Sequence, residues 1–230
     1  MKKQVIIIFG PPGAGKGTQA GLLSEKLGIY HLESSKVIEK CFSNENPDKV
    51  FEIDGKKYKL AEEIENWKTG ILTSPPFVTF LMSQEIEKLA ERAESFIMSG
   101  SPRTIYEVEN EMPVLEKLYG KVGIKILMLE ITPEATIFRN SHRKICELMR
   151  HPILFSKETE KLTVCPLDGS KLVKREGLDD PESIKVRIKE YEERTLPMVE
   201  YFNKNNFNLH RINGEQTVAD VFKDVLKAIE

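Results

Sequence analysis

The stretch that decides the fold runs from residue 5 to residue 18 and reads Val5-Ile6-Ile7-Ile8-Phe9-Gly10-Pro11-Pro12-Gly13-Ala14-Gly15-Lys16-Gly17-Thr18. Its apolar first half is typical of a strand that is buried on both faces inside a parallel sheet. The glycine-rich turn after it leads into a helical pattern, which is the context of a phosphate-binding loop. In such a loop backbone N–H groups surround phosphate oxygens, and Lys16 reaches the β- and γ-phosphates.

The rest of the chain alternates between short apolar runs and charged amphipathic segments. We expect strands at residues 4–9, 29–32, 95–98, 124–131 and 207–212, and helices at 19–27, 78–93, 182–202 and 217–229. This alternation predicts a doubly wound α/β fold with a parallel five-stranded sheet flanked by helices. The predicted core domain comprises residues 1–35, 75–138 and 181–230. Residues 36–74 and 139–180 break the pattern and are predicted to be inserts at the ligand-binding edge of the sheet.

Composition excludes several classes of protein. The chain has 230 residues, of which 40% are hydrophobic and 30% are charged, and its net charge is only −2. We therefore expect no nucleic-acid binding driven by a basic surface. The longest apolar run is far shorter than the ~20 residues of a membrane span, so we expect no membrane partner and a cytoplasmic location. A monomer is the default expectation.

Further motifs, in the same order along the chain, resemble a known family. The loop pattern Gly-x-Pro-Gly-x-Gly-Lys-Gly-Thr-Gln, with Gly17 directly after Lys16, resembles the loop of adenylate kinases, which are P-loop nucleoside monophosphate kinases. Residues 100–104, Gly-Ser-Pro-Arg-Thr, resemble the family segment whose arginine grips the acceptor phosphate. Residues 139–146 and 165–175 resemble the two ends of the family's lid. The resemblance covers nearly the whole chain.

The resemblance implies an activity and its site residues. It implies Mg²⁺-dependent, in-line transfer of a phosphoryl group from ATP to a nucleoside monophosphate, most simply AMP, beneath a closing lid. The implied catalytic residues are Lys16, Arg103, Arg139, Arg143, Arg175 and Arg187. The implied ATP-binding residues are Gly10, Pro12, Gly13, Ala14, Gly15, Lys16, Gly17, Thr18, Arg139 and Gln216. The implied acceptor-binding residues are Ser34, Lys36, Glu39, Leu72, Gly100, Arg103 and Glu107. The spacing of Arg139 and Arg143 predicts that both lie on one helix face.

The acceptor side departs from the family pattern at three positions. Glu39 stands where the family has a phosphate-binding arginine, a loss for which Lys36 could compensate, and Ser99 replaces an aspartate near the Mg²⁺ water shell. Glu107 replaces the glutamine that reads adenine. A carboxylate can accept two hydrogen bonds from a guanine edge, so GMP is an alternative acceptor, beside UMP and CMP. A degenerate protein that senses ATP without transfer is an alternative of another class.

The predicted lid contains a damaged metal-ligand pattern. Relatives often carry two Cys-x₂-Cys or Cys-x₂-Asp pairs there, whereas this chain has Cys146-x₂-Met149 and Cys165-x₂-Asp168. A thioether is a poor zinc ligand, and His151 could replace it. The candidate set for a structural zinc ion is therefore Cys146, His151, Cys165 and Asp168. The alternative is a metal-free lid held by apolar packing.

Overall fold

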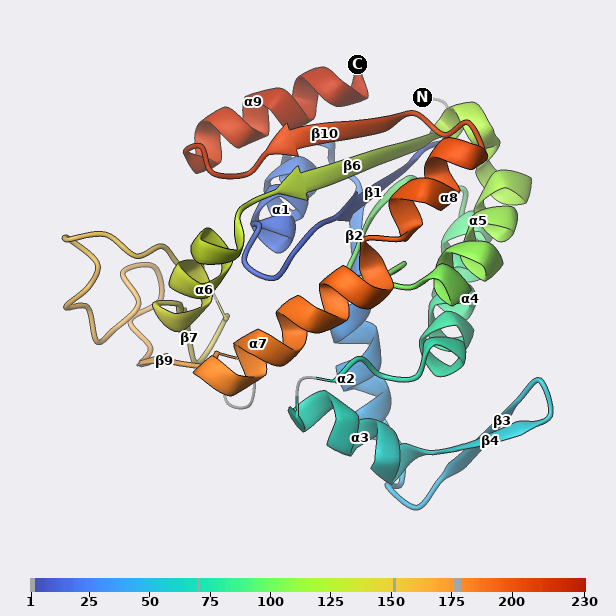
Figure 1. Cartoon of the computed structure of the whole chain (residues 1–230), viewed down its shortest axis with the longest axis horizontal. Coiled ribbons are helices and arrows are strands. Elements are labelled where there is room, and N and C mark those ends of the chain that lie inside the picture. The colour runs from blue at the N-terminus through green and yellow to red at the C-terminus, as the bar shows by residue number, and fades with distance from the viewer. Residues whose placement is uncertain (1–2, 70, 151, 176–178) are drawn as a thin grey trace.

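A five-stranded parallel sheet forms the centre of the computed structural model, which describes residues 3–69, 71–150, 152–175 and 179–230 (Figure 1). Ile7 in the central strand lies opposite Met98 on one side and Ile126 on the other. All five strands are parallel, so their carboxyl ends meet at one edge of the sheet, where ligands bind in such folds. The strand order is β10 (Leu209–Asn213), β6 (Ile124–Glu130), β1 (Val5–Phe9), β5 (Phe96–Ser99) and β2 (Tyr30–Glu33).

Helices cover both faces of the sheet, as the apolar run of β1 predicts. Ile6 and Ile8 belong to the apolar core of one face, and Ile7 and Phe9 to that of the other, and all four are buried. The first face is covered by α1 (Lys16–Leu27) and α9 (Val218–Ile229), and the second by α4 (Pro75–Glu91), α5 (Ile105–Tyr119) and α8 (Met198–Lys204) (Figure 1). The predicted fold class is confirmed.

The predicted helix over 182–202 is wrong as a continuous element. The chain forms α7 (Pro181–Glu190), a π-helical turn (Tyr191–Thr195) and then α8. The Leu196 N–H donates to the carbonyl of Tyr191 at 2.8 Å, and Pro197 has no N–H with which to continue the ladder. Strand β10 also begins two residues later than predicted, because the Phe207 N–H donates to the Phe202 carbonyl at 2.9 Å at the end of α8.

Helix α5 was not among the predicted elements, although its start is readable in the sequence. Thr104 is the N-cap and its hydroxyl accepts from the Glu107 N–H at 3.2 Å. Threonine followed three residues later by glutamate is a capping box, which marks a helix start. The predicted helices over 19–27 and 78–93 exist, but α1 begins three residues earlier and α4 begins at Pro75.

The segments that break the alternation form small units outside the main sheet. The first contains α2 (Ser34–Asn44), a hairpin of β3 (Val50–Ile53) and β4 (Lys56–Lys59), and α3 (Leu60–Thr69). The second follows α6 (Pro133–Ser141) and contains an antiparallel sheet of β8 (Pro152–Ile153), β7 (Lys144–Cys146) and β9 (Leu172–Val173). A short 3₁₀ turn, Lys121–Gly123, precedes β6. Within the described part of the chain, no helix combines the length and apolarity needed to cross a bilayer.

Phe51, Ile53 and Tyr58 hold the hairpin against the core. Phe51 packs edge-on against Phe77 and Phe80 of α4, with ring centroids 5.0 Å and 6.2 Å apart. The neighbouring Val50 is 46% exposed. Because aromatic pairs add to the free energy of burial, Phe51 is an anchor of the hairpin.

We expect Phe51→Ala to lower the free energy of unfolding by about 2 kcal/mol, because a half-buried ring and two aromatic contacts are lost. Val50→Ala, on the exposed side of the same strand, is the matched control and should cost less than about 1 kcal/mol. Denaturant unfolding of the purified variants measures both values. Equal losses in the two variants would contradict the anchoring role of Phe51.

Candidate phosphate-binding site

The loop between β1 and α1 is folded as a phosphate-binding loop. The Ala14 N–H donates to the Pro11 carbonyl at 3.2 Å, and α1 starts directly at Lys16. Gly13 has a φ of 84°, and a Cβ there would come within 2.7 Å of the Asn140 side-chain nitrogen. The backbone of the loop can therefore approach α6 only because position 13 is glycine. The N–H groups at the start of α1 remain available to an anion.

Lys16 lies at the centre of a cluster of cations. Its ammonium group donates to the carbonyls of Gly10 and Pro11, at 2.8 Å each. Burial lowers the pKa of Lys16 well below its ordinary value, and the positive charges of nearby arginines lower it further. Those arginines are Arg103, Arg187, Arg143 and Arg175. The structure thus brings together five of the predicted catalytic cations, and a bound polyphosphate would relieve their mutual repulsion.

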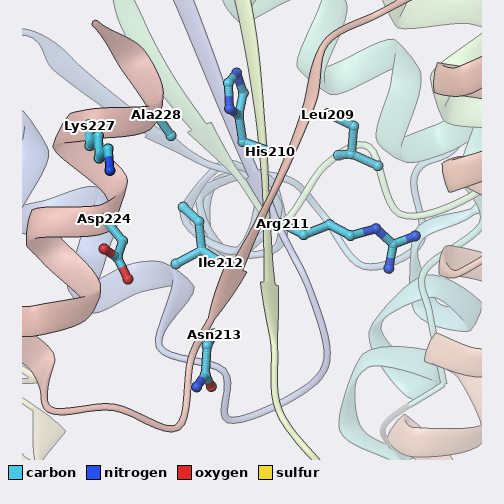
Figure 2. Close-up of a pocket in the computed structure, with 8 residues that line it drawn as sticks. All are labelled: Leu209, His210, Arg211, Ile212, Asn213, Asp224, Lys227 and Ala228. Atoms are coloured by element: carbon cyan, nitrogen blue, oxygen red, sulfur yellow. The ribbon is translucent and has the colours of Figure 1, made fainter.

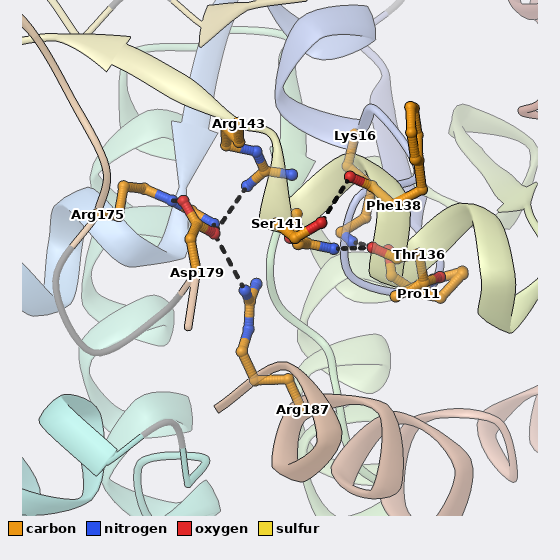
Figure 3. Close-up of polar contacts among 10 residues, drawn as sticks. Pro11, Lys16, Thr136, Phe138, Ser141, Arg143, Arg175, Asp179 and Arg187 are labelled. Carbon is orange, nitrogen blue, oxygen red and sulfur yellow. Dashed lines mark hydrogen bonds and ion pairs between the residues drawn. The ribbon is translucent and has the colours of Figure 1, made fainter. Parts of the chain in front are cut away.

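Asp179 holds three of these arginines together (Figure 3). Its carboxylate accepts two hydrogen bonds from Arg175, at 2.9 Å and 2.5 Å, and lies 3.9 Å from the guanidinium groups of both Arg143 and Arg187. The carboxylate is almost fully buried. Burial and the neighbouring Arg175 lower the pKa of Arg143 to about 10 and that of Arg187 to about 9. One anion therefore orients three cations that would otherwise repel one another.

Arg139 and Arg143 do not share a helix face, which corrects the prediction from their spacing. Helix α6 ends at Ser141, and the Phe138 carbonyl accepts from the Ser141 hydroxyl at 3.1 Å and contacts the His142 ring at 2.8 Å. These local side-chain contacts satisfy a helix-end carbonyl and end the helix. The Arg139 guanidinium donates to the carbonyls of Gly214 and Gly13, at 2.9 Å and 3.3 Å. Arg139 therefore joins the phosphate-binding loop to the loop after β10.

Arg103 extends from the loop after β5, where the sequence predicts it. A Cβ on Gly100 would come within 3.0 Å of the Arg103 guanidinium and would overlap the Ser34 hydroxyl. Gly100 has a φ of 89°, so glycine is required for both the backbone conformation and the close approach. Burial lowers the pKa of Arg103, and the carboxylates of Glu107 and Glu33 oppose that shift. Three predicted acceptor-site residues, Ser34, Gly100 and Arg103, thus lie together.

Glu107, the predicted reader of the acceptor base, accepts hydrogen bonds from three protein groups. One carboxylate oxygen accepts from the Ser101 hydroxyl at 2.8 Å and from the Arg103 N–H at 2.9 Å. The other oxygen accepts from the Thr104 hydroxyl at 3.1 Å. The side chain is only 2% exposed. Three protein donors therefore already contact this carboxylate, and its contact with the acceptor base stays a prediction.

The other predicted acceptor residues contact protein groups. The Lys36 ammonium lies 3.4 Å from the Glu33 carboxylate, and Glu39 lies 3.8 Å from Arg150 in the predicted lid. The Leu72 N–H donates to the Glu190 carboxylate of α7 at 3.3 Å. Glu39 therefore links the first insert to the second, and Leu72 links the first insert to α7.

Gln216 is tied to α9. Its side-chain amide donates to the Asn213 carbonyl at 3.0 Å and to the Asp224 carboxylate at 2.8 Å. Asp224 and Asn213 also line a hollow between β10 and α9 (Figure 2). The other lining residues are Leu209, His210, Arg211, Ile212, Lys227 and Ala228, so none of the predicted phosphate-binding residues borders this hollow.

Three of the four predicted zinc ligands lie together in the predicted lid. The donor atoms of Cys146, Cys165 and Asp168 all lie within 4.8 Å of one another. The Cys146 thiol and the Asp168 carboxylate are 3.0 Å apart. The fourth candidate, His151, lies outside the described residues. Two thiols and a carboxylate are chemically suited to zinc, although a structural zinc site takes four ligands.

From the sequence, no role in the site is predicted for Asp179, Glu190 or Glu111. Asp179 follows the predicted lid arginine Arg175 by four residues, a spacing at which opposite charges pair. Glu111 lies four residues after Glu107 on an otherwise apolar helix face, which was a usable signal, because such a carboxylate must find a partner or hold a proton. For Glu190 the sequence contains no comparable signal.

We expect Asp179→Asn to destabilise the nucleotide-free protein by about 3 kcal/mol, because three buried arginines lose their shared anion. ATP should raise the melting temperature of the variant more than that of the wild type, since its phosphates replace the lost charge. Differential scanning fluorimetry with and without ATP measures both effects.

Asp180→Asn is the matched control. Asp180 is the N-cap of α7 and accepts from the Ser183 N–H at 3.0 Å. Asparagine caps a helix as well as aspartate does, so the melting temperature of the control should match that of the wild type. If Asp179→Asn behaves like this control, the shared-anion role is wrong.

Comparison with known proteins identifies the family. A family model described as adenylate kinase matches residues 8–207. A protein named adenylate kinase from Petrotoga mobilis is 31% identical, over 97% of this chain and 96% of its own length. Another from Caldicellulosiruptor bescii is 32% identical, over 97% of this chain and 98% of its own length. The chain therefore belongs to the adenylate kinase family.

Proposed function

We propose that this enzyme transfers the terminal phosphoryl group of ATP to AMP and forms two molecules of ADP. The main support is the convergence of Lys16, Arg103, Arg143, Arg175 and Arg187 at the edge of the sheet. Phosphoryl transfer leaves little covalent work to the protein, and a preorganised set of cations stabilises the charge on the transferring oxygens. The names of the relatives support the same activity.

Each cation has a distinct part in the proposed reaction. Lys16 and the N–H groups of the loop bind the β- and γ-phosphates of ATP, and Arg103 binds the phosphate of AMP. Arg143, Arg175 and Arg187 surround the group in transit, with Asp179 fixing their directions. Arg139 shapes the ATP side through its bonds to the Gly13 and Gly214 carbonyls.

Mg²⁺ would neutralise phosphate charge and relies largely on phosphate oxygens and water. The residues present are chemically suited to hold its water shell. Thr18 supplies a hydroxyl in the first turn of α1. Glu33 supplies a carboxylate and lies opposite Ser99 in the register of β2 and β5, next to the position of the missing family aspartate.

We assign residues 36–74 to an acceptor-binding insert and residues 139–180 to a lid. Contacts from these segments to each other and to α7 support this division. Glu39 and Arg150 form an ion pair between the two inserts, and the Leu72 N–H donates to Glu190, three residues after Arg187. Closing the lid would exclude water that would otherwise accept the phosphoryl group.

We expect Lys16→Ala and Arg103→Ala each to lower kcat/KM at least about 100-fold, because each removes a cation from the transferring group. Lys59→Ala removes an exposed cation from the hairpin and is the control; its activity should stay within about twofold, as exposed pairs contribute little. A coupled assay of ADP formation measures all three variants. Near wild-type turnover in either site variant would refute the proposed roles.

The acceptor is tested by incubating Mg·ATP separately with AMP, GMP, CMP and UMP and separating the diphosphates by chromatography. Preferential formation of ADP from AMP supports the proposal. Preference for another base would assign the departures at Glu39, Ser99 and Glu107 to specificity. Binding of ATP without transfer to any acceptor would favour the degenerate sensor.

Metal analysis of the purified protein decides between a lid with a structural zinc ion and a metal-free lid. About one zinc ion per chain, lost in Cys165→Ser, would support a structural site built on Cys146, Cys165 and Asp168. A fully active protein without zinc would support a lid held by packing and by the contact between Cys146 and Asp168.

A further inference from the structure

A single serine hydroxyl lies between two buried carboxylates beneath the Arg103 loop. The Ser101 oxygen is 2.8 Å from one oxygen of Glu107 and 2.7 Å from one oxygen of Glu111. Ser101 is 1% exposed, Glu107 2% and Glu111 0%. Two carboxylates at hydrogen-bond distance from one hydroxyl, away from water, form an arrangement that the proposed mechanism does not use.

The number of hydrogens restricts the protonation state of this group. A serine hydroxyl has one hydrogen and can donate to only one carboxylate oxygen. If both glutamates were ionised, the second short contact would bring two acceptors together without a hydrogen between them. One carboxyl group must therefore carry a proton and donate it to the Ser101 oxygen.

The remaining contacts assign the proton to Glu111. Glu107 accepts from the Arg103 N–H and from the Thr104 hydroxyl besides Ser101, and three donors suit an ionised carboxylate. The second oxygen of Glu111 is buried and has no hydrogen-bond partner among the described residues. An unpartnered oxygen costs less on a neutral acid than on a carboxylate.

We propose that Glu111 is a protonated carboxylic acid at neutral pH, and that the hydrogen-bond chain from Glu111 through Ser101 to ionised Glu107 positions Arg103 for the acceptor phosphate. The role of Arg103 in this statement rests on the proposed function. Glu111 and Ser101 act only through Glu107, whose carboxylate holds the Arg103 N–H. They are positioning residues that touch no substrate.

The surrounding charges agree with this assignment. Burial raises the pKa of Glu111 well above its ordinary value, and the neighbouring charge of Glu107 raises it further. Burial also raises the pKa of Glu107, but the hydrogen bonds from Ser101 and Arg103 and the charge of Arg103 oppose that shift. The elements packed against α5 carry these charged residues, none of which is buried: Glu85, Glu87, Lys88 and Glu91 of α4, Lys121 of the 3₁₀ turn, Lys125 and Glu130 of β6, and Glu200 and Lys204 of α8. Glu107 is the neighbouring charge that acts on Glu111.

Infrared spectroscopy tests the proton independently of catalysis. At neutral pH the exposed carboxyl groups are ionised, so a carboxylic-acid C=O band must come from a buried acid. We expect the band in the wild type and its loss in Glu111→Gln. Glu109→Gln, an exposed neighbour on the same helix, should leave it unchanged. A wild type without the band, or a band that persists in Glu111→Gln, overturns the proposal even if the enzyme is fully active.

The pH dependence of stability provides a second readout that needs no substrate. The folded state binds the Glu111 proton more tightly than the unfolded chain, in which the pKa is near 4.5. The bound proton stabilises the folded state fully below pH 4.5, and this stabilisation is lost as the pH rises through the pKa of Glu111 in the folded state. The free energy of unfolding of the wild type should therefore fall with rising pH relative to that of Glu111→Gln. A constant difference between the two proteins contradicts a bound proton.

The positioning role is tested by comparing Glu111→Gln with Glu111→Met. Glutamine can donate an N–H to Ser101 as the acid does, whereas methionine has similar volume and no donor. We expect a near wild-type KM for the acceptor in Glu111→Gln and an increase of about tenfold in Glu111→Met, with the KM for ATP within twofold in both. Circular dichroism verifies that both variants fold. Equal KM values in the two variants refute the positioning role; absence of transfer in the wild type would instead refute the proposed function and leave the infrared result standing.

Discussion

Repulsion between like charges is the constraint on which the rest of this structure depends. Lys16 and four arginines are held close together, and burial, followed by the charges of the neighbouring arginines, lowers the pKa of Lys16, Arg143 and Arg187. Hydrogen-bond acceptors stabilise these cations, chiefly the Asp179 carboxylate and the carbonyls around Lys16. A site built in this way is complementary to a polyphosphate before the ligand arrives, so little reorganisation is needed during the reaction.

The fold is the means by which distant residues reach this cluster. The carboxyl ends of β1 and β5 are adjacent because the strands are parallel neighbours, and they place Lys16 and Arg103 at one edge. Arg143 and Arg175 come from the segment between α6 and α7, and Arg187 comes from α7. Two acidic residues contact the cluster: Asp179 pairs with Arg143, Arg175 and Arg187, and Glu107 accepts from the Arg103 N–H.

The sheet, the phosphate-binding loop and most cations of the site could be predicted from the sequence. These features depend on local patterns and on the order of the family motifs along the chain. The sequence did not predict side-chain contacts between residues that lie far apart in the chain. Glu107 and Glu39 occupy substrate positions in the family pattern, yet here they pair with Ser101 and with Arg150. Other errors were local and avoidable. The capping box at Thr104 and the Asp54-Gly55 turn, in which both residues have positive φ, are readable signals of α5 and of the hairpin.

The ion pair between Glu39 and Arg150 has a thermodynamic consequence for substrate binding. In the proposed closure of the two inserts, this pair forms only when both have closed, so it contributes free energy to the closed state alone. A contact of this kind makes closure of one insert favour closure of the other, and by linkage the effect is reciprocal: ATP strengthens AMP binding by the same factor as AMP strengthens ATP binding. The pair is exposed, so this coupling is worth at most about 1 kcal/mol and weakens as salt screens it.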